Sequence, residues 1–580
     1  GVEVKDNREK EPEPIVPAWE QKKKSKVKSF DLHPDIPMSE RHNFDLANNQ
    51  VEEVNKKERF HRNYAAIKVL KDCQNENRFA TPDEQKILSR YVGWGGIPEA
   101  FDERAGAWHT EYAMLKNILT PEEYASARES TLTAFYTPPE VSTAIYKVLE
   151  QMGFQEGNLL EPSCGIGNFI GMLPKSMENA KVYGVELDTV SAGIAQQLYQ
   201  KSSIAAQGFE EVNVPDSFFD GVIGNVPFGQ YQVNDRAYNK LGFSIHDYFF
   251  AKTLDQVRPG GVVAFVTSRY TMDKQSPEVR KYIAERAELL GAIRLPNNAF
   301  RANAGTDVVS DIIFLQKRDH PISIEPDWVH LDRNKDGYAI NSYFTEHPEM
   351  VLGRETSEST QYGRQDFTVV PIEGADLAEQ LHEAVQHIGG KYQEAELPDL
   401  GDDEEVKETI PADPNVKNFS FTVVEGEVYY RENSIMVKPD LNTTAKERVK
   451  GLVGLRDCVS ELINLQMDEF TSDAEVRLKQ AELNERYDDF SAKFGLINDR
   501  SNRLAFSNDS SYYLLCSLEV IDENGKLERK ADMFSKRTIR QHRSVESVDT
   551  AVEALAVSIG ERARVDLPYM ASLCGKSIEE

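Results

Sequence analysis

Four residues whose types suit ligand chemistry stand directly after three short apolar runs of this sequence. Gly165 and Gly167 follow the first run, and a glycine turn that opens a helix lets backbone N–H groups approach a ligand closely. Glu186 ends the second run roughly 20 residues later, where a carboxylate can accept hydrogen bonds from ribose hydroxyls. Asn225 ends the third run. The first two features together predict a ligand that contains adenosine, bound at one edge of a parallel sheet.

The segment Asn225-Val226-Pro227-Phe228 adds a second kind of chemistry. An asparagine amide offers an acceptor as well as donors, and a rigid turn that contains proline can present a neighbouring backbone carbonyl. The ring of Phe228 can stack on a planar substrate. Two acceptors aimed at one amino group, beside a stacking ring, are what transfer to an exocyclic amine needs.

The order of these segments resembles that of the gamma-type N6-adenine DNA methyltransferases, whose signature is Asn-Pro-Pro followed by Tyr or Phe. Thr137-Pro138-Pro139 precedes the glycine turn, as a Thr-Pro-Pro segment does in that family, and the resemblance covers residues 135–318. Residues 90–96, 487–490 and 510–514 also resemble the flanks of the methylase part of large methylase–helicase proteins of conjugative elements and phages. That family uses S-adenosyl-L-methionine, so the resemblance implies this cofactor.

The resemblance also implies roles for individual residues. The side chain of Asn225 and the backbone carbonyl of Val226 would accept hydrogen bonds from the amino group of the substrate. Pro227 would shape the catalytic turn, and Phe228 would stack on the adenine. Phe300 lies in a segment that resembles the part of the family supporting a flipped base, so it is expected to contact the second face of the substrate.

Three departures from the family pattern bear on activity more than on cofactor binding. Val226 stands where the family has proline, and Phe228 replaces the commoner tyrosine. Gly208 precedes Phe209, where many relatives have aspartate before the ring that flanks the adenine of the cofactor. The residues that the resemblance assigns to cofactor binding are Tyr136, Thr137, Pro138, Glu161, Pro162, Cys164, Gly165, Gly167, Glu186, Leu187 and Phe209.

The expected fold is α/β, a Rossmann-like S-adenosylmethionine-dependent methyltransferase sheet with a helical N-terminal extension and an α+β C-terminal region. The three apolar runs would be strands whose ends deliver their last residues to one crevice. A helix that begins near Ile245 would end at the Pro-Gly-Gly of residues 259–261. Further strands are predicted over residues 262–267, 289–295 and 311–315.

Changes in composition and period divide the chain into five expected regions. A flexible tether rich in Lys, Glu and Pro precedes a helical N-terminal region, in which Thr81 and Thr120 begin helices. A methyltransferase domain follows, then a small β-rich extension with an acidic linker. The C-terminal region is expected to contain two antiparallel helices and a strand over residues 510–520. The expected boundaries are 1–58, 59–134, 135–320, 321–435 and 436–580.

Two side chains near the expected site have competing interpretations. Trp94, in the segment Gly93-Trp94-Gly95-Gly96, could pack against the catalytic domain or contact DNA, and packing is favoured. His246 could be taken for a general base. Because the substrate nitrogen loses its proton only during or after attack, and the family has no dedicated base, a packing or positioning role is favoured.

The composition limits the location and partners of the protein. The 580 residues exceed one hydrophobic core, and the net charge of −29 means that a DNA-binding groove must be a local basic patch. Five scattered cysteines, with no Cys-x-x-Cys pair, argue against a metal site or a disulfide framework. No apolar run approaches the roughly 18 residues of a membrane span, and no signal peptide is visible. We expect a cytoplasmic protein, encoded by a bacterium or a phage.

The expected function is in-line transfer of a methyl group from S-adenosyl-L-methionine to N6 of a flipped adenine in DNA, which would protect mobile-element DNA from restriction. Two alternatives remain open. The same motif serves enzymes that methylate a glutamine amide in proteins, and an acidic chain could be a catalytically weak interaction module that mimics DNA. No helicase motor is visible, so a helicase or specificity partner is expected beyond Glu580 or on another chain.

Overall fold

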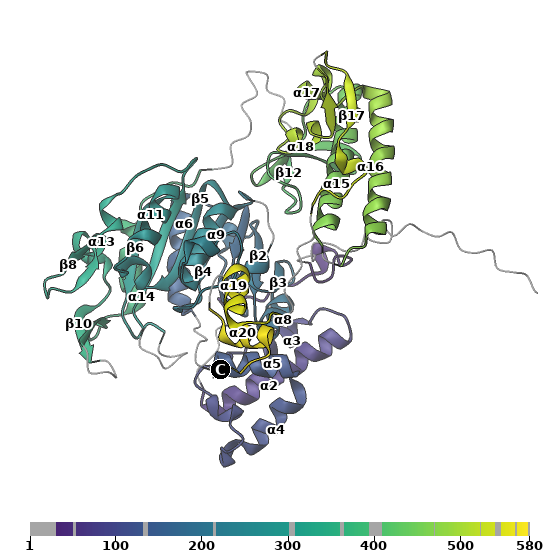
Figure 1. Cartoon of the computed structure of the whole chain (residues 1–580). Coiled ribbons are helices and arrows are strands. Elements are labelled where there is room, and N and C mark those ends of the chain that lie inside the picture. Colours follow the sequence, from purple (N-terminus) through teal and green to yellow (C-terminus); the bar gives the residue numbers. More distant parts are fainter. Residues whose placement is uncertain are drawn as a thin grey trace, which may run out of the picture. The chain divides into compact units, whose positions relative to one another are not determined.

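The computed structural model describes residues 31–49, 54–131, 137–212, 216–300, 308–359, 365–393, 409–468, 470–522, 524–539, 547–562 and 565–577. The chain divides into two compact units, coloured along the sequence in Figure 1. The described part of the larger unit lies within residues 30–418, 431–437 and 547–580. That of the smaller unit lies within residues 419–430 and 438–546.

A seven-stranded sheet with the order β3-β2-β1-β4-β5-β7-β6 forms the centre of the larger unit. Neighbours from β3 to β5 pair in parallel, and β7 runs antiparallel to both β5 and β6. Strands β1 and β4 are buried along almost their whole length, as in sheets covered on both faces, although Asn158, Glu161 and Asp220 interrupt their apolar sequences. The expected Rossmann-like α/β class is confirmed. The strands are β1 (Asn158–Glu161), β2 (Lys181–Glu186), β3 (Ser203–Ala206), β4 (Phe219–Asn225), β5 (Val257–Ser268), β6 (Ala287–Leu295) and β7 (Ser310–Lys317).

The chain reverses the direction of strand addition between β1 and β4, so their carboxyl ends flank the place where open α/β sheets bind ligands. The strands predicted over residues 289–295 and 311–315 are confirmed as β6 and β7. Strand β3 is absent from the prediction because Ile204 is the one fully buried residue among its four. The connecting helices are α6 (Pro139–Met152), α7 (Asn168–Gly171), α8 (Thr189–Leu198), α9 (Ile245–Gln256), α10 (Tyr270–Asp273) and α11 (Glu278–Arg286).

The prediction that the helix from Ile245 reaches residues 259–261 is wrong, because α9 ends at Gln256 and the Pro-Gly-Gly lies inside β5. The β4–β5 register shifts between Phe219 and Gly221, which accommodates the proline as a local irregularity. A Cβ on Gly261 would come within 2.8 Å of the backbone oxygen of Asp220. The glycine therefore permits two backbones to approach closely within the sheet rather than ending a helix.

The predicted N-terminal helical region is present, and both predicted helix starts are confirmed. Thr81 and Thr120 each form a capping box, in which the threonine side chain and a glutamate three residues later satisfy each other's backbone N–H groups. Residues 31–49, part of the expected tether, pack against the end of α8, where Phe44 N donates to Leu198 O at 2.8 Å. The helices are α2 (Lys56–Asn75), α3 (Pro82–Leu88), α4 (His109–Ile118) and α5 (Pro121–Ser130).

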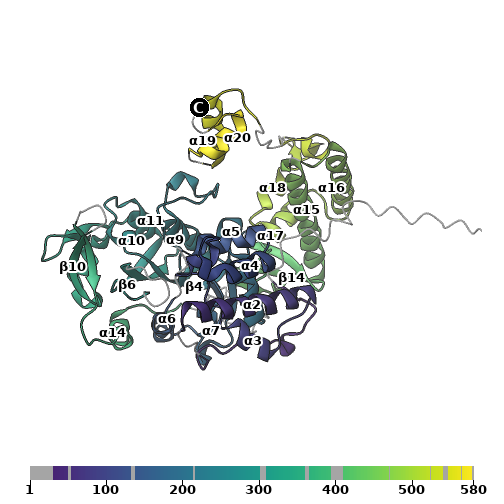
Figure 2. The ribbon, with the colours of Figure 1, turned by 90° about the horizontal axis from the view of Figure 1, so that it is seen from below.

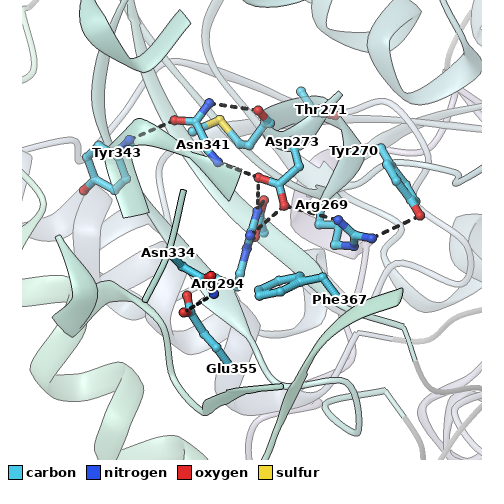
Figure 3. Close-up of polar contacts among 12 residues, drawn as sticks. Arg269, Tyr270, Thr271, Asp273, Arg294, Asn334, Asn341, Tyr343, Glu355 and Phe367 are labelled. Carbon is cyan, nitrogen blue, oxygen red and sulfur yellow. Dashed lines mark hydrogen bonds and ion pairs between the residues drawn. The ribbon is translucent and has the colours of Figure 1, made fainter. Parts of the chain in front are cut away.

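A small extension follows the sheet and is tied to it by a buried ion network (Figure 3). The guanidinium of Arg294, which is 0% exposed, contacts both oxygens of Asp273 and of Asp311. Asn341 of the extension donates its backbone N–H to Asp273 at 3.0 Å. The elements of the extension are β8 (Leu331–Arg333), β9 (Ala339–Asn341), α13 (Ser342–Glu346), β10 (Arg354–Ser359), β11 (Gln365–Val370), α14 (Leu377–Ala384), β12 (Thr409–Pro411) and β15 (Ile435–Val437).

The smaller unit is built on two long helices, as predicted. Their buried faces include Leu452 and Val459 of one helix and Leu483 and Phe490 of the other. The strand predicted over residues 510–520 is wrong, since a short helix occupies its middle and only its last two residues belong to a strand. The elements are β13 (Ser420–Val424), β14 (Glu427–Glu432), α15 (Thr443–Met467), α16 (Asp473–Phe494), α17 (Arg500–Phe506), α18 (Tyr512–Cys516), β16 (Glu519–Ile521) and β17 (Leu527–Lys530). Near the end of the chain, α19 (Ala551–Arg562) and α20 (Leu567–Cys574) belong to the larger unit.

Candidate active site

A cavity of about 230 Å³ lies at the carboxyl ends of β1, β2 and β4. The three segments singled out in the sequence meet there, because these strands are neighbours in the sheet. The residues of the expected cofactor set that line the cavity are Thr137, Glu161, Cys164, Gly165 and Glu186. All four residues of the catalytic segment, Asn225, Val226, Pro227 and Phe228, line it as well.

The glycine turn after β1 is fixed by the neighbouring strand and helix. Gly165 N donates to one carboxylate oxygen of Glu186 at 2.8 Å, and Asp188 N donates to the other at 2.8 Å. Gly167 has a φ of +85° at the start of α7, and a Cβ there would lie 2.5 Å from the ring of Tyr199. Only glycine therefore fits this position, and the turn can pass close to a ligand.

Two carboxylates face the cavity in a buried setting. Burial, and to a lesser degree the neighbouring Glu186, raises the pKa of Glu161 well above its ordinary value. The Oε2 atom of Glu161 is buried and has no hydrogen-bond donor among the described residues. Burial raises the pKa of Glu186 to about 7, against the lowering effect of the N–H groups of Asp188 and Gly165. Glu186 can therefore carry a proton near neutral pH.

We expect the affinity for an adenosine-containing cofactor to rise with pH around neutrality. The ionised form of Glu186 accepts hydrogen bonds from hydroxyls best, and it replaces the protonated form as the pH passes about 7. Between pH 6 and pH 8 the affinity should increase about ten-fold, measured by isothermal titration calorimetry with S-adenosylhomocysteine. Glu186→Gln should bind more weakly and lose this pH dependence; an unchanged slope in that variant would contradict the assignment.

Asn225 is the last residue of β4 and lines the cavity. Its Oδ1 atom is buried and has no hydrogen-bond donor among the described residues. Val226, 2% exposed, continues the pairing with β5, because its backbone N–H donates to Val266 O at 3.1 Å. Phe228 follows two residues later on the wall of the same cavity. A buried acceptor without a partner costs free energy unless a ligand supplies the donor.

Other predicted site residues lie away from the cavity. Pro138 lines a second cavity of about 790 Å³, which shares Thr137 and Asn168 with the first. Leu187 is 71% exposed, whereas Phe209 is buried with its ring centroid 4.8 Å from that of Phe249. Pro162, Gly167 and Phe300 are also outside the cavity lining, Phe300 being buried, and Tyr136 lies outside the described residues.

The cavity also contains residues that the sequence analysis does not assign to it. Ser163, Ile166 and Asn168 belong to the glycine turn itself. Their position next to the predicted cofactor residues is the sequence signal that could have identified them. Tyr91, Gly93 and Ser130 come from the N-terminal helical region. Gly93 is in the segment around Trp94, for which packing and ligand contact are treated as alternatives.

Trp94 is 1% exposed and packs against aromatic residues of the N-terminal region, with its ring centroid 5.4 Å from that of Phe101. Trp94 is therefore buried by packing, but its ring contacts among the described residues are Phe60, Tyr91 and Phe101 of the N-terminal region and not the catalytic domain as expected. His246 is 2% exposed, and its Nε2 lies 3.2 Å from Ser244 Oγ. Burial lowers the pKa of His246, and its side chain does not line the cavity. These contacts favour packing over general-base catalysis.

The described residues contain neither a metal-binding cluster nor a membrane-spanning helix. No group of three or more His, Cys, Asp or Glu side chains in this part of the chain could hold a metal ion. No helix within the described ranges is long and apolar enough to cross a membrane.

Comparison with known proteins gives two family matches. Residues 118–329 match the N-6 DNA Methylase family, and residues 547–580 match a family described as probable helicase, winged helix domain. The chain is 30% identical over 247 residues to "Defense against restriction protein B" of Escherichia phage P1, a match that covers 42% of this chain and 9% of the phage protein. It is 36% identical over 95 residues to "Type II methyltransferase M.CvrRI" of Paramecium bursaria Chlorella virus XZ-6E, covering 16% of this chain and 24% of that protein.

Both matches span far less than two thirds of the relatives' own length. Among solved structures, one of a putative class I S-adenosylmethionine-dependent methyltransferase from Listeria monocytogenes is 19% identical, with a TM-score of 0.30 and coverage of 47% of this chain and 90% of that chain. The sheet described above and the family match agree in their bounds, because β1 to β7 lie within residues 118–329. Residues 118–329 of this chain therefore form a domain of the N-6 DNA methylase family.

Proposed function

We propose that this protein is an S-adenosylmethionine-dependent N6-adenine DNA methyltransferase. The observation that carries the proposal is the buried Oδ1 of Asn225, which has no donor among the described residues and lines the same cavity as Phe228. An amino group attached to a planar base supplies the missing donor and a face for the ring to stack on.

The residues around the cavity fit the cofactor. Glu161 Oε2 lacks a donor, which an ammonium or hydroxyl group would provide, and Glu186 has acceptor sites beyond its two backbone N–H partners. The second cavity adjoins the first through Thr137 and Asn168, which gives space for a ligand larger than the first cavity alone. S-adenosyl-L-methionine supplies an electrophilic methyl group when bound.

The protein's own residues would orient the substrate. A target adenine leaves the duplex at a cost of about a few kcal/mol. Phe228 stacks on it, and Asn225 Oδ1 together with the Val226 carbonyl accepts hydrogen bonds from its amino group. This directs the nitrogen lone pair for in-line displacement, so most of the rate gain comes from positioning and from stabilisation of developing charge.

The partners follow from the two family matches. A winged-helix match at residues 547–580 supports a helicase or specificity partner, on this polypeptide or on another. The name of the phage relative supports a role in protecting mobile-element DNA from restriction. A chain with a net charge of −29 must bind DNA through local basic surfaces, so binding should weaken steeply with salt.

Parallel transfer assays test the proposal against its rivals. The full chain is incubated with radiolabelled S-adenosyl-L-methionine and with DNA, RNA or protein, and the labelled product is digested to identify the modified residue. We expect label on N6 of adenine in DNA. Label on a glutamine amide would favour a protein methyltransferase, and DNA binding without transfer to any substrate would favour an interaction module.

A further inference from the structure

We propose that the segment Tyr91–Gly93 forms one wall of the cofactor site, so that the N-terminal helical region is part of that site. This inference rests on the proposed function. Tyr91 and Gly93 line the 230 Å³ cavity together with Glu161, Glu186 and Asn225. The family match begins at residue 118, so this wall lies outside the matched residues.

The wall is held by one buried amide. Asn63 of α2 is 0% exposed, and its Nδ2 donates to Gly93 O at 2.6 Å while its Oδ1 accepts from Val92 N at 2.9 Å. Both ends of the amide therefore bind the backbone of the wall itself. Arg59, one helical turn earlier, donates to Gly95 O at 2.8 Å. A buried amide that is satisfied at both ends fixes the path of the backbone it binds.

The helical region that carries the wall is also tied to the methyltransferase domain beside the cavity. Ser126 of α5 donates its hydroxyl to Asp188 at 3.0 Å, two residues after the end of β2. Figure 2 shows α2, α4 and α5 grouped with one another. The wall is thus set relative to the strand ends rather than being a loose cover.

A wall in this position would help to enclose a bound ligand. The strand ends and the glycine turn enclose a ligand from the sheet side, and Tyr91, Gly93 and Ser130 enclose it from the helical side. Enclosure removes water from the ligand and strengthens its polar contacts with Glu161 and Glu186. Loosening the backbone at Val92 and Gly93 should therefore weaken cofactor binding. This effect is expected even though Asn63 and helix α2 lie outside the residues that match the family.

A matched pair of full-length variants tests the inference. Asn63→Ala releases the wall, whereas Gln85→Ala removes a buried amide of the same region that binds helix α8 instead. Calorimetry with S-adenosylhomocysteine should show a Kd raised at least about ten-fold for Asn63→Ala and by less than about two-fold for Gln85→Ala. Both variants should lose thermal stability to a similar extent. An equal loss of cofactor affinity in the two variants would therefore reflect the loss of stability and would overturn the inference.

A second pair tests the wall without removing a buried group. Ser130 is half-buried and lines the cavity, whereas the adjacent Glu129 is exposed and does not. Ser130→Phe should fill the space and weaken binding at least about ten-fold, while Glu129→Phe should bind within about two-fold of the wild type. If the wild type binds S-adenosylhomocysteine and both Asn63→Ala and Ser130→Phe bind it as tightly as the wild type does, the inference about the wall is refuted and the proposed function is not. A wild type that binds none refutes the proposed function as well.

Discussion

Replacing Asn225 with alanine is expected to lower the rate of methyl transfer to adenine about 100- to 1000-fold, the scale of losing one preorganised polar contact to the reacting group. The Oδ1 atom is buried in the cavity and lacks a donor among the described residues, so it is available to the substrate amino group. Cofactor affinity should stay within about two-fold of the wild type, because Glu186 and the glycine turn are untouched. Single-turnover transfer and calorimetry measure the two quantities separately.

The control for this variant is Asn234→Ala, which removes an exposed asparagine from the loop that follows the catalytic segment. The amide of Asn234 accepts from Asn239 at 2.8 Å and does not line the cavity. It should transfer methyl groups at the wild-type rate. An Asn225→Ala protein that keeps full activity would remove Asn225 from the catalytic assignment, whatever the cofactor affinity.

The largest effect on stability is expected at Arg294. Its guanidinium makes four contacts of 2.8 to 2.9 Å with Asp273 and Asp311, in a site that is inaccessible to water. Arg294→Ala would remove the guanidinium that pairs with the buried Asp311 and would leave Asp273 with the longer ion pair to Arg269, at 3.3 Å. Removing one partner from a buried ion pair costs about 3–5 kcal/mol. Urea denaturation followed by circular dichroism should show a large shift in the transition of the larger unit.

Arg286→Ala is the matched control, because Arg286 is partly exposed and pairs with Glu285 at 3.2 Å. A surface pair of this kind contributes about 0–1 kcal/mol. Equal stability losses in the two variants would contradict the importance of the buried network. Because β6 leads directly into residues 296–300, a folded Arg294→Ala protein should also bind substrate less tightly.

The elements that sequence reasoning located are those with strong local signals. Capping boxes at Thr81 and Thr120 mark helix starts through residues only three positions apart. Buried strands such as β4 and β7 contain short apolar runs, at residues 222–223 and 312–315. The meeting of β1, β2 and β4 at one edge follows from the general rule that parallel strands direct their carboxyl ends the same way.

The elements that sequence reasoning missed depend on long-range contacts. The Pro-Gly-Gly of β5 has the composition of a helix stop, and only its pairing with β4 makes it part of a strand. Tyr91 and Gly93 join the cavity because Asn63, about thirty positions earlier, binds that backbone. Phe209 has the expected type and place in the sequence, but its ring packs against α9 rather than toward the cavity. No local pattern records such contacts.

The hydrogen bond that the backbone N–H of Val226 donates bears on any substitution of this residue by the proline that is commoner in the family. A proline there would fix the turn through its ring, whereas this protein fixes it by a hydrogen bond from Val226 to Val266. Proline has no N–H to donate, so installing it would break a link between two central strands. A proline ring and a hydrogen bond from the backbone N–H are therefore alternative ways to fix the same carbonyl, and one position cannot use both. The neighbouring strand β5 supplies the acceptor for the hydrogen bond found here.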